Sequence, residues 1–173
     1  MLGLAHDSNI MVPYDPGWAD AFAVECERLN RALGGLAVAI EHYGSTAVPG
    51  LSAKPILDIL VGVRRSEDWQ RCHGPLVALG YDYAAHAGVE GHHIFGRGRD
   101  LSERTHLVHV VAHGGESWTS NLAFRDALRA DEDLRQRYIA VKTAAMAKAP
   151  ESRADYNRLK AGAIAAFKAE LLS

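Results

Sequence analysis

The chain has 173 residues, of which 48% are apolar and 23% are charged, and its formal net charge is −2. This length is enough for one domain with a buried core, and the composition is that of a globular protein rather than a disordered or fibrous one. The slightly acidic balance predicts no nucleic-acid partner. No stretch of about 18 uncharged apolar residues occurs, so we expect no membrane-spanning helix and no membrane partner.

Two features predict a cytoplasmic location. The N-terminal residues MLGLAHDSN do not have the basic region and long apolar core of a signal peptide. Cys26 and Cys72 fall within predicted helices and outside any CxxC pair, so we interpret them as reduced thiols.

The first elements in chain order are a helix and two strands. Apolar residues recur at helical spacing at Trp18, Phe22, Cys26, Leu29 and Leu33. Asp15 is the expected N-cap, and Gly34 ends the helix. Residues 36–43 and 55–63 read as strands, and the nearly continuous apolar pattern of the second predicts a central strand covered on both faces.

In the rest of the chain, predicted helices and strands alternate less regularly. Residues 69–79 form a predicted helix that ends at Gly80, and short strands are expected over 81–85, 92–97 and 105–111. The C-terminal third reads as helical throughout. We therefore predict an α+β fold, with a mixed β-sheet flanked by helices. We expect a single domain over 1–173, made of a sheet-containing core (about 1–113) and a helical unit packed on it (about 116–172).

The stretch 41–63, EHYGSTAVPGLSAKPILDILVGV, carries the strongest functional signal. Gly44 lets backbone approach a ligand closely, and the hydroxyls and amides of Ser45 and Thr46 can form an anion-binding concavity. Lys54 adds a cation at the end of the loop. Asp58, in the next strand, can bind a divalent ion together with phosphate oxygens. These residue types predict a site for phosphate groups and a metal ion.

Simpler interpretations remain open for the same residues. Gly44 and Ser45 can form an ordinary tight turn, because short glycine motifs often occur without function. A buried carboxylate such as Asp58 needs a partner, and a structural one such as Lys54 or a histidine would also satisfy it.

Histidines and arginines gather around the later strands. Side chains alternate along a strand, so His109 and His106 point to opposite faces. If the face of His109 lies beside Asp58, His109 can serve as a metal ligand or general base, with His106 as a secondary candidate. Magnesium or manganese is the expected ion, and zinc ranks below them because the spacing matches no closed zinc site. Arg104 is the preferred phosphate clamp, and Arg97 is a secondary candidate.

Several motifs together resemble the GrpB family. They are YDPGW at 14–18, GSTAVPGLSAKPILDILV at 44–61, RTHLVHVV at 104–111 and WTSNLAFRDALR at 118–129, with Tyr138, Lys142 and residues 156–160 in the C-terminal helices. The family lies within the nucleotidyltransferase superfamily, and relatives occur fused to dephospho-coenzyme A kinase. The resemblance implies a nucleotidyltransferase-like fold over nearly the whole chain. The superfamily pattern follows its glycine-serine turn with two acids one residue apart, whereas Ile56 and Leu60 flank Asp58 here.

Three functions follow from these observations. The first is a nucleotidyltransferase that uses a nucleoside triphosphate and a divalent metal on an unknown acceptor, with Asp58 and His109 in the catalytic roles. The second is a non-catalytic module that binds a nucleotide or a coenzyme A-like molecule, which the broken acid pair favours. The third is a scaffold or interaction domain that retains the turn for folding.

Overall fold

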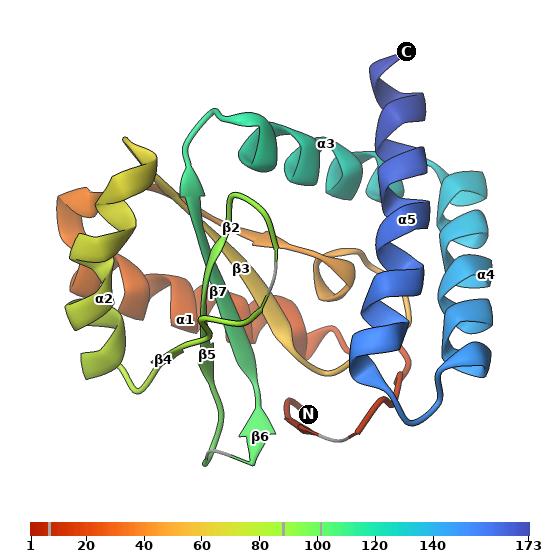
Figure 1. Ribbon diagram of the computed structural model, residues 1–173, viewed down its shortest axis with the longest axis horizontal. Coiled ribbons are helices and arrows are strands. Elements are labelled where there is room, and N and C mark those ends of the chain that lie inside the picture. Colours follow the sequence, from red (N-terminus) through yellow and green to blue (C-terminus); the bar gives the residue numbers. More distant parts are fainter. Residues whose placement is uncertain (7, 88, 101) are drawn as a thin grey trace.

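A mixed sheet forms the centre of the computed structural model, which describes every residue except Asp7, Gly88 and Leu101 and, within the last helix, the side chain of Leu172. The sheet order is β2-β3-β7-β5-β4, and only the β3–β7 pair is parallel (Figure 1). The strands are β2 (Ala37–Tyr43), β3 (Leu57–Val63), β4 (Asp82–Tyr83), β5 (His93–Arg97) and β7 (His106–Ala112). β3 lies between β2 and β7, as the apolar pattern predicts.

Five α-helices surround this sheet in the described part of the chain. They are α1 (Gly17–Leu33), α2 (Trp69–Ala78), α3 (Glu116–Ala130), α4 (Glu132–Lys148) and α5 (Arg153–Leu172). Short 3-10 turns occur at η1 (Gly34–Leu36), η2 (Ser45–Ala47) and η3 (Ser66–Asp68). The predicted α+β class is confirmed. No helix among the described residues combines the length and apolar character needed to cross a bilayer.

Several strand bounds differ from the sequence prediction: β2 begins at Ala37, β3 at Leu57 and β5 at His93, and β4 is shortened to Asp82–Tyr83. A further difference lies just before β7. The strand expected over 105–111 begins at His106, and the residues just before it form a separate strand, β6 (Glu103–Arg104). This strand pairs with β1 (Leu4–Ala5) in a separate two-stranded sheet. Thr105, between β6 and β7, donates its amide to the Arg97 carbonyl at 2.8 Å.

Local signals explain where α1 begins and ends. Pro16, rather than the expected Asp15, is the N-cap of α1, because the helix begins at Gly17. The Asp15 carboxylate still accepts a hydrogen bond from the Gly17 amide at 2.9 Å, which satisfies a donor that the first turn leaves without a helical partner. Gly34 follows the last residue with a φ of 52°, a conformation that side chains disfavour.

The alternation of side chains along β3 gives the sheet two different faces. Odd-numbered residues from Leu57 to Val63 join the main core beneath α1 and α2. Asp58 and Leu60 point to the opposite face, where Leu60 packs with Tyr43, Val111 and Trp118. The parallel register places Leu60 beside His109, so Asp58 and His109 share a face. The sequence expectation that His109 and Asp58 lie on one side of the sheet is confirmed.

The three C-terminal helices pack together beside this second face (Figure 1). A core cluster joins them to the loop after β2 through Val48 and Leu51 of the loop and Phe124, Leu128, Leu134, Tyr138 and Phe167 of the helices. Arg125 of α3 also binds Glu41 and the His42 carbonyl, at 2.7 and 2.8 Å. Arg125 therefore holds the helical unit against the sheet.

A buried ion-pair network occupies the α1 side of the sheet. Glu25, which is 2% exposed, accepts hydrogen bonds from Tyr81, Arg97 and Arg28 at 2.7–2.8 Å. His106 lies next to Arg97, with its Nδ1 3.3 Å from the guanidinium. Arg97 and His106 are thus bound into the core on the face opposite Asp58.

Breaking this network should lower stability without affecting a ligand on the other face. We predict that Glu25→Gln lowers the free energy of unfolding by about 3 kcal/mol, because it leaves the Arg97 guanidinium without its charge partner. For a domain of this size, that lowers Tm by roughly 6–12 °C in thermal denaturation. The matched control is Glu27→Gln on the same helix, whose ion pair with Arg31 is exposed, and it should leave Tm unchanged. Equal Tm values for the two variants would contradict a structural role for the network.

Candidate functional site

The Asp58 carboxylate lies directly against the glycine-serine turn. Gly44 follows the last residue of β2 with a φ of 73°, and a Cβ placed on it would lie 2.7 Å from Asp58 Oδ2. Tyr43, the residue before it, pairs with Asp58 across the β2–β3 ladder. A glycine is needed here for two reasons, since both the backbone conformation and the carboxylate exclude a side chain. The Asp58 side chain is 33% exposed, so a cation or ligand can reach it.

Ser45 points toward the helical unit and meets a buried lysine. Lys142 of α4 is 2% exposed, and its ammonium donates to Ser45 Oγ at 3.2 Å and to the Ser52 carbonyl. Both acceptors are neutral oxygens, although a buried ammonium is normally matched by a carboxylate. The Ser45 turn and α4 are therefore joined by a positive charge.

The Thr46 side chain contacts a histidine of β2, although the motif predicts that it contributes to the anion-binding turn. Its hydroxyl is 2.9 Å from His42 Nε2, and both side chains are buried. Burial lowers the pKa of His42 to about 4, so this histidine is neutral near pH 7. The His42 ring stacks on Phe22 of α1, on the side of the sheet away from Asp58. The Thr46 side chain is not part of the candidate site, because its hydroxyl is already hydrogen-bonded to His42.

Lys54 also forms no salt bridge within the part of the chain that the structure describes. Its ammonium lies 3.9 Å from the centre of the Tyr156 ring, where a cation–π attraction offsets part of the cost of burial. Nζ is buried, and among the described residues it has no hydrogen-bond partner. Lys54 therefore does not provide the structural salt bridge to Asp58 that the sequence leaves open.

Two further cations from α5 complete what we call the cationic cluster: Lys54, Lys142, Arg153 and Lys160, with Asp58 among them. Burial, reinforced by the charges of Lys160 and Arg153, lowers the pKa of Lys54 to about 7. Burial and the charge of Lys160 lower the pKa of Lys142 to about 7. The charge of Asp58 opposes these shifts, as it also does for Arg153. In the described part of the chain, Asp58 is the carboxylate whose charge acts on these groups, and below pH 7, where both lysines are charged, it does not balance four cations.

His109 approaches the same carboxylate from β7. Its Nε2 is 3.5 Å from Asp58 Oδ1, which is too long for a good hydrogen bond, and this buried atom has no other partner in the described chain. The other ring nitrogen, Nδ1, is 3.1 Å from Nδ1 of His92. His92, for which the sequence predicts no role, thus orients the His109 ring so that Nε2 faces Asp58.

This donor set fits one divalent ion and does not fit two. An oxygen and a nitrogen 3.5 Å apart can both bind one ion, provided that phosphate oxygens and water supply its other ligands. Among the described residues, no group of three or more His, Cys, Asp or Glu side chains lies close enough to hold a metal. Two-metal phosphoryl transfer needs more carboxylate ligands than this site supplies.

The arginines predicted to clamp phosphate have other partners. Arg104 lies on the Asp58 face of the sheet, over Gly96, but its guanidinium is paired with Asp82 at 2.7 Å. Arg97 is paired with Glu25 on the opposite face, beside His106. The structure therefore brings together Gly44, Ser45, Lys54, Asp58 and His109, whereas Arg97 and His106 lie away from them.

Comparison with known proteins agrees with this arrangement at the level of family and fold. Residues 9–170 match the family described as GrpB protein. The chain belongs to the GrpB family. It is 32% identical to the glutamate-rich protein GrpB of Alkalihalophilus pseudofirmus, over 92% of this chain and 94% of the relative. The crystal structure of the conserved protein GrpB from Enterococcus faecalis has a TM-score of 0.81 and 31% identity, and covers 94% of this chain and 97% of that one.

More distant likenesses bear on the GrpB fold. The Cid1 poly(U) polymerase bound to magnesium and 3′-dATP superposes with a TM-score of 0.53 at 12% identity, over 86% of this chain and 49% of that one. The fold is therefore nucleotidyltransferase-like. A dephospho-CoA kinase of Mycolicibacterium paratuberculosis is 32% identical over 84% of this chain, which spans 40% of that protein. The GrpB fold thus also forms part of longer chains.

The stability of this GrpB protein should increase when Lys54 loses its charge. We predict that Lys54→Met raises Tm by several degrees at pH 7, because a buried ammonium without a hydrogen-bond partner is replaced by an apolar side chain of similar length. The folded-state pKa is about 7, below the ordinary 10.5, so the penalty is complete below pH 7 and disappears as pH approaches 10.5. The Tm gain should therefore shrink between pH 7 and pH 10.

The control for this measurement is Lys148→Met at the exposed end of α4, which should leave Tm unchanged at either pH. A lower Tm for Lys54→Met at pH 7 would mean that the Tyr156 ring more than compensates the ammonium for its burial.

Proposed function

We propose that this protein binds the phosphate groups of a nucleotide, or of a related phosphorylated small molecule, between the Ser45 turn and helices α4 and α5. The observation that carries the proposal is the excess of positive charge around Asp58. Lys54 has no hydrogen-bond partner among the described residues, and Lys142 donates to neutral oxygens. A polyphosphate would supply the missing negative charge and accept several charge-assisted hydrogen bonds.

In this proposal the residues have different tasks. Ser45 and Lys142 hold a phosphate at the turn, and Lys54, Arg153 and Lys160 offset its charge. Asp58 holds a single magnesium or manganese ion, which would neutralise phosphate charge when bound. Nε2 of His109 is available as a further ligand, which favours manganese because imidazole suits transition metals better than magnesium.

A nucleotidyl-transfer reaction is the second candidate function. The fold likeness to nucleotidyltransferases and the placement of Asp58 beside Gly44 and Ser45 support it. The shortage of carboxylates favours binding without transfer, because positioning and charge neutralisation must then come from one ion and the lysines. The name of the mycobacterial relative, dephospho-CoA kinase, supports a coenzyme A-like molecule as an alternative ligand.

Two variants test the proposed roles by calorimetric titration with ATP, UTP and coenzyme A, each with and without manganese. We predict that Lys142→Met weakens binding of the preferred ligand about 10- to 100-fold, because it removes a buried charge-assisted hydrogen bond. Asp58→Asn should abolish the part of the affinity that depends on manganese, while it keeps the size of the side chain.

Arg99→Met serves as the control, since Arg99 is an exposed hairpin cation that is paired with Glu103. It should bind like the wild type. If Asp58→Asn retains the full manganese effect, the ion is bound elsewhere. If none of these ligands binds to the wild type, the proposed function is wrong. Pyrophosphate release by the wild type that is lost in Asp58→Asn would establish transfer over simple binding.

A further inference from the structure

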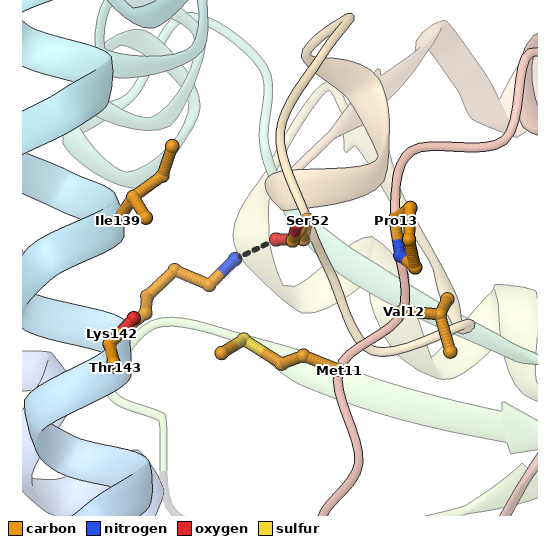
Figure 2. Close-up of a pocket in the computed structure, with 7 residues that line it drawn as sticks. All are labelled: Met11, Val12, Pro13, Ser52, Ile139, Lys142 and Thr143. Carbon is orange, nitrogen blue, oxygen red and sulfur yellow. Dashed lines mark hydrogen bonds between the residues drawn. The ribbon is translucent and has the colours of Figure 1, made fainter.

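A small pocket lies between the N-terminal segment, the loop at Ser52 and helix α4 (Figure 2). Its volume is about 200 Å³. Three segments line it: the N-terminal residues Met11, Val12 and Pro13, the loop residue Ser52, and Ile139, Lys142 and Thr143 of α4. None of these residues except Lys142 has a role in the phosphate site described above.

Two contacts connect this pocket to the cationic cluster. Figure 2 shows Lys142 reaching from α4 across the pocket to the Ser52 carbonyl. The same ammonium binds Ser45 Oγ at 3.2 Å, so one buried charge borders both the pocket and the turn. On the other side of the pocket, Sδ of Met11 is 4.0 Å from the hydroxyl of Tyr156. The Tyr156 ring makes the cation–π contact with Lys54. A ligand with a phosphate at Ser45 would therefore have the pocket within reach of its organic part.

The lining of the pocket favours a compact aromatic ring. Val12, Pro13 and Ile139 give part of the lining an apolar character. The Met11 thioether makes favourable contacts with aromatic rings, and Ser52 and Thr143 contribute hydroxyls that can bind ring nitrogens or carbonyls. Sites that enclose a whole drug-sized ligand measure about 300–1,000 Å³, so this smaller pocket suits one ring system rather than an entire nucleotide or a pantetheine chain.

We propose that this pocket receives the nucleobase of a nucleotide whose phosphates lie at Ser45 and Lys142. The inference rests on the proposed function and adds to it: the ligand is a phosphate ester with a compact heterocycle at its other end. Lys142 joins the two parts of the site, because its ammonium belongs to both.

The test compares inorganic triphosphate with ATP and UTP in calorimetric titrations of the wild type and of Thr143→Phe. Thr143 is an exposed residue on α4, so the larger side chain fills the pocket mouth without entering the core. We expect a nucleoside triphosphate to bind the wild type at least about tenfold more tightly than inorganic triphosphate. Thr143→Phe should remove that gain and leave the affinity for inorganic triphosphate unchanged, whereas Thr143→Ser should keep both affinities.

Each outcome separates this inference from the function on which it rests. If inorganic triphosphate binds but the nucleoside adds no affinity, or if the gain survives in Thr143→Phe, the pocket is not the base site while the phosphate site stands. If inorganic triphosphate does not bind either, both proposals fail. Photolabelling of the wild type with an azido-adenine triphosphate needs no variant: label on residues 11–13, on Ser52 or on residues 139–143 supports the inference, and label confined to other segments overturns it.

Discussion

The close approach of Asp58 to Gly44 is the constraint on which the rest of the site depends. Because the carboxylate lies where a Cβ would be, the turn after β2 brings its backbone and Ser45 next to a negative charge without an intervening side chain. The β2–β3 pairing fixes this approach within one hairpin-like unit, and the helical unit then surrounds it with positive charge. Among the described residues the result is one accessible carboxylate near four basic side chains, an arrangement that destabilises their charged forms until an anion binds.

The two faces of the sheet differ in how well their charged groups are paired. The α1 and α2 side holds the main apolar core and the buried Glu25 network, where each charge has a partner at hydrogen-bond distance. The other side keeps Lys54 without a hydrogen-bond partner among the described residues. Arg125 and Arg129 of α3 bind the carbonyls of His42 and Ala47 on either side of the turn, so the turn is held firmly while the lysines beside it remain poorly satisfied. Such local destabilisation is common where a protein binds a ligand.

Much of the fold and part of the site could be predicted from the sequence. Helical and strand periodicity located the main elements, and the GSTAVPGLSAKPILD segment predicted that Gly44 and Asp58 meet, because that contact depends on two neighbouring strands. The contact of Lys142 with Ser45 joins residues 97 positions apart and depends on how α4 packs, which no local pattern encodes. Arg97 pairs with His106 across the β5–β7 ladder, so it shares the face of His106, away from His109. The pairing of Arg104 with Asp82 could not be predicted, because the sequence does not reveal where Asp82 lies.

Anomalous diffraction from a crystal soaked with manganese and a non-hydrolysable nucleoside triphosphate would locate the ion and the phosphates together. We expect a manganese peak bonded to the Asp58 carboxylate, with phosphate oxygens hydrogen-bonded to Ser45 and Lys142. A nucleotide bound with its phosphates on another face, or manganese bound at residues away from Asp58, would contradict it.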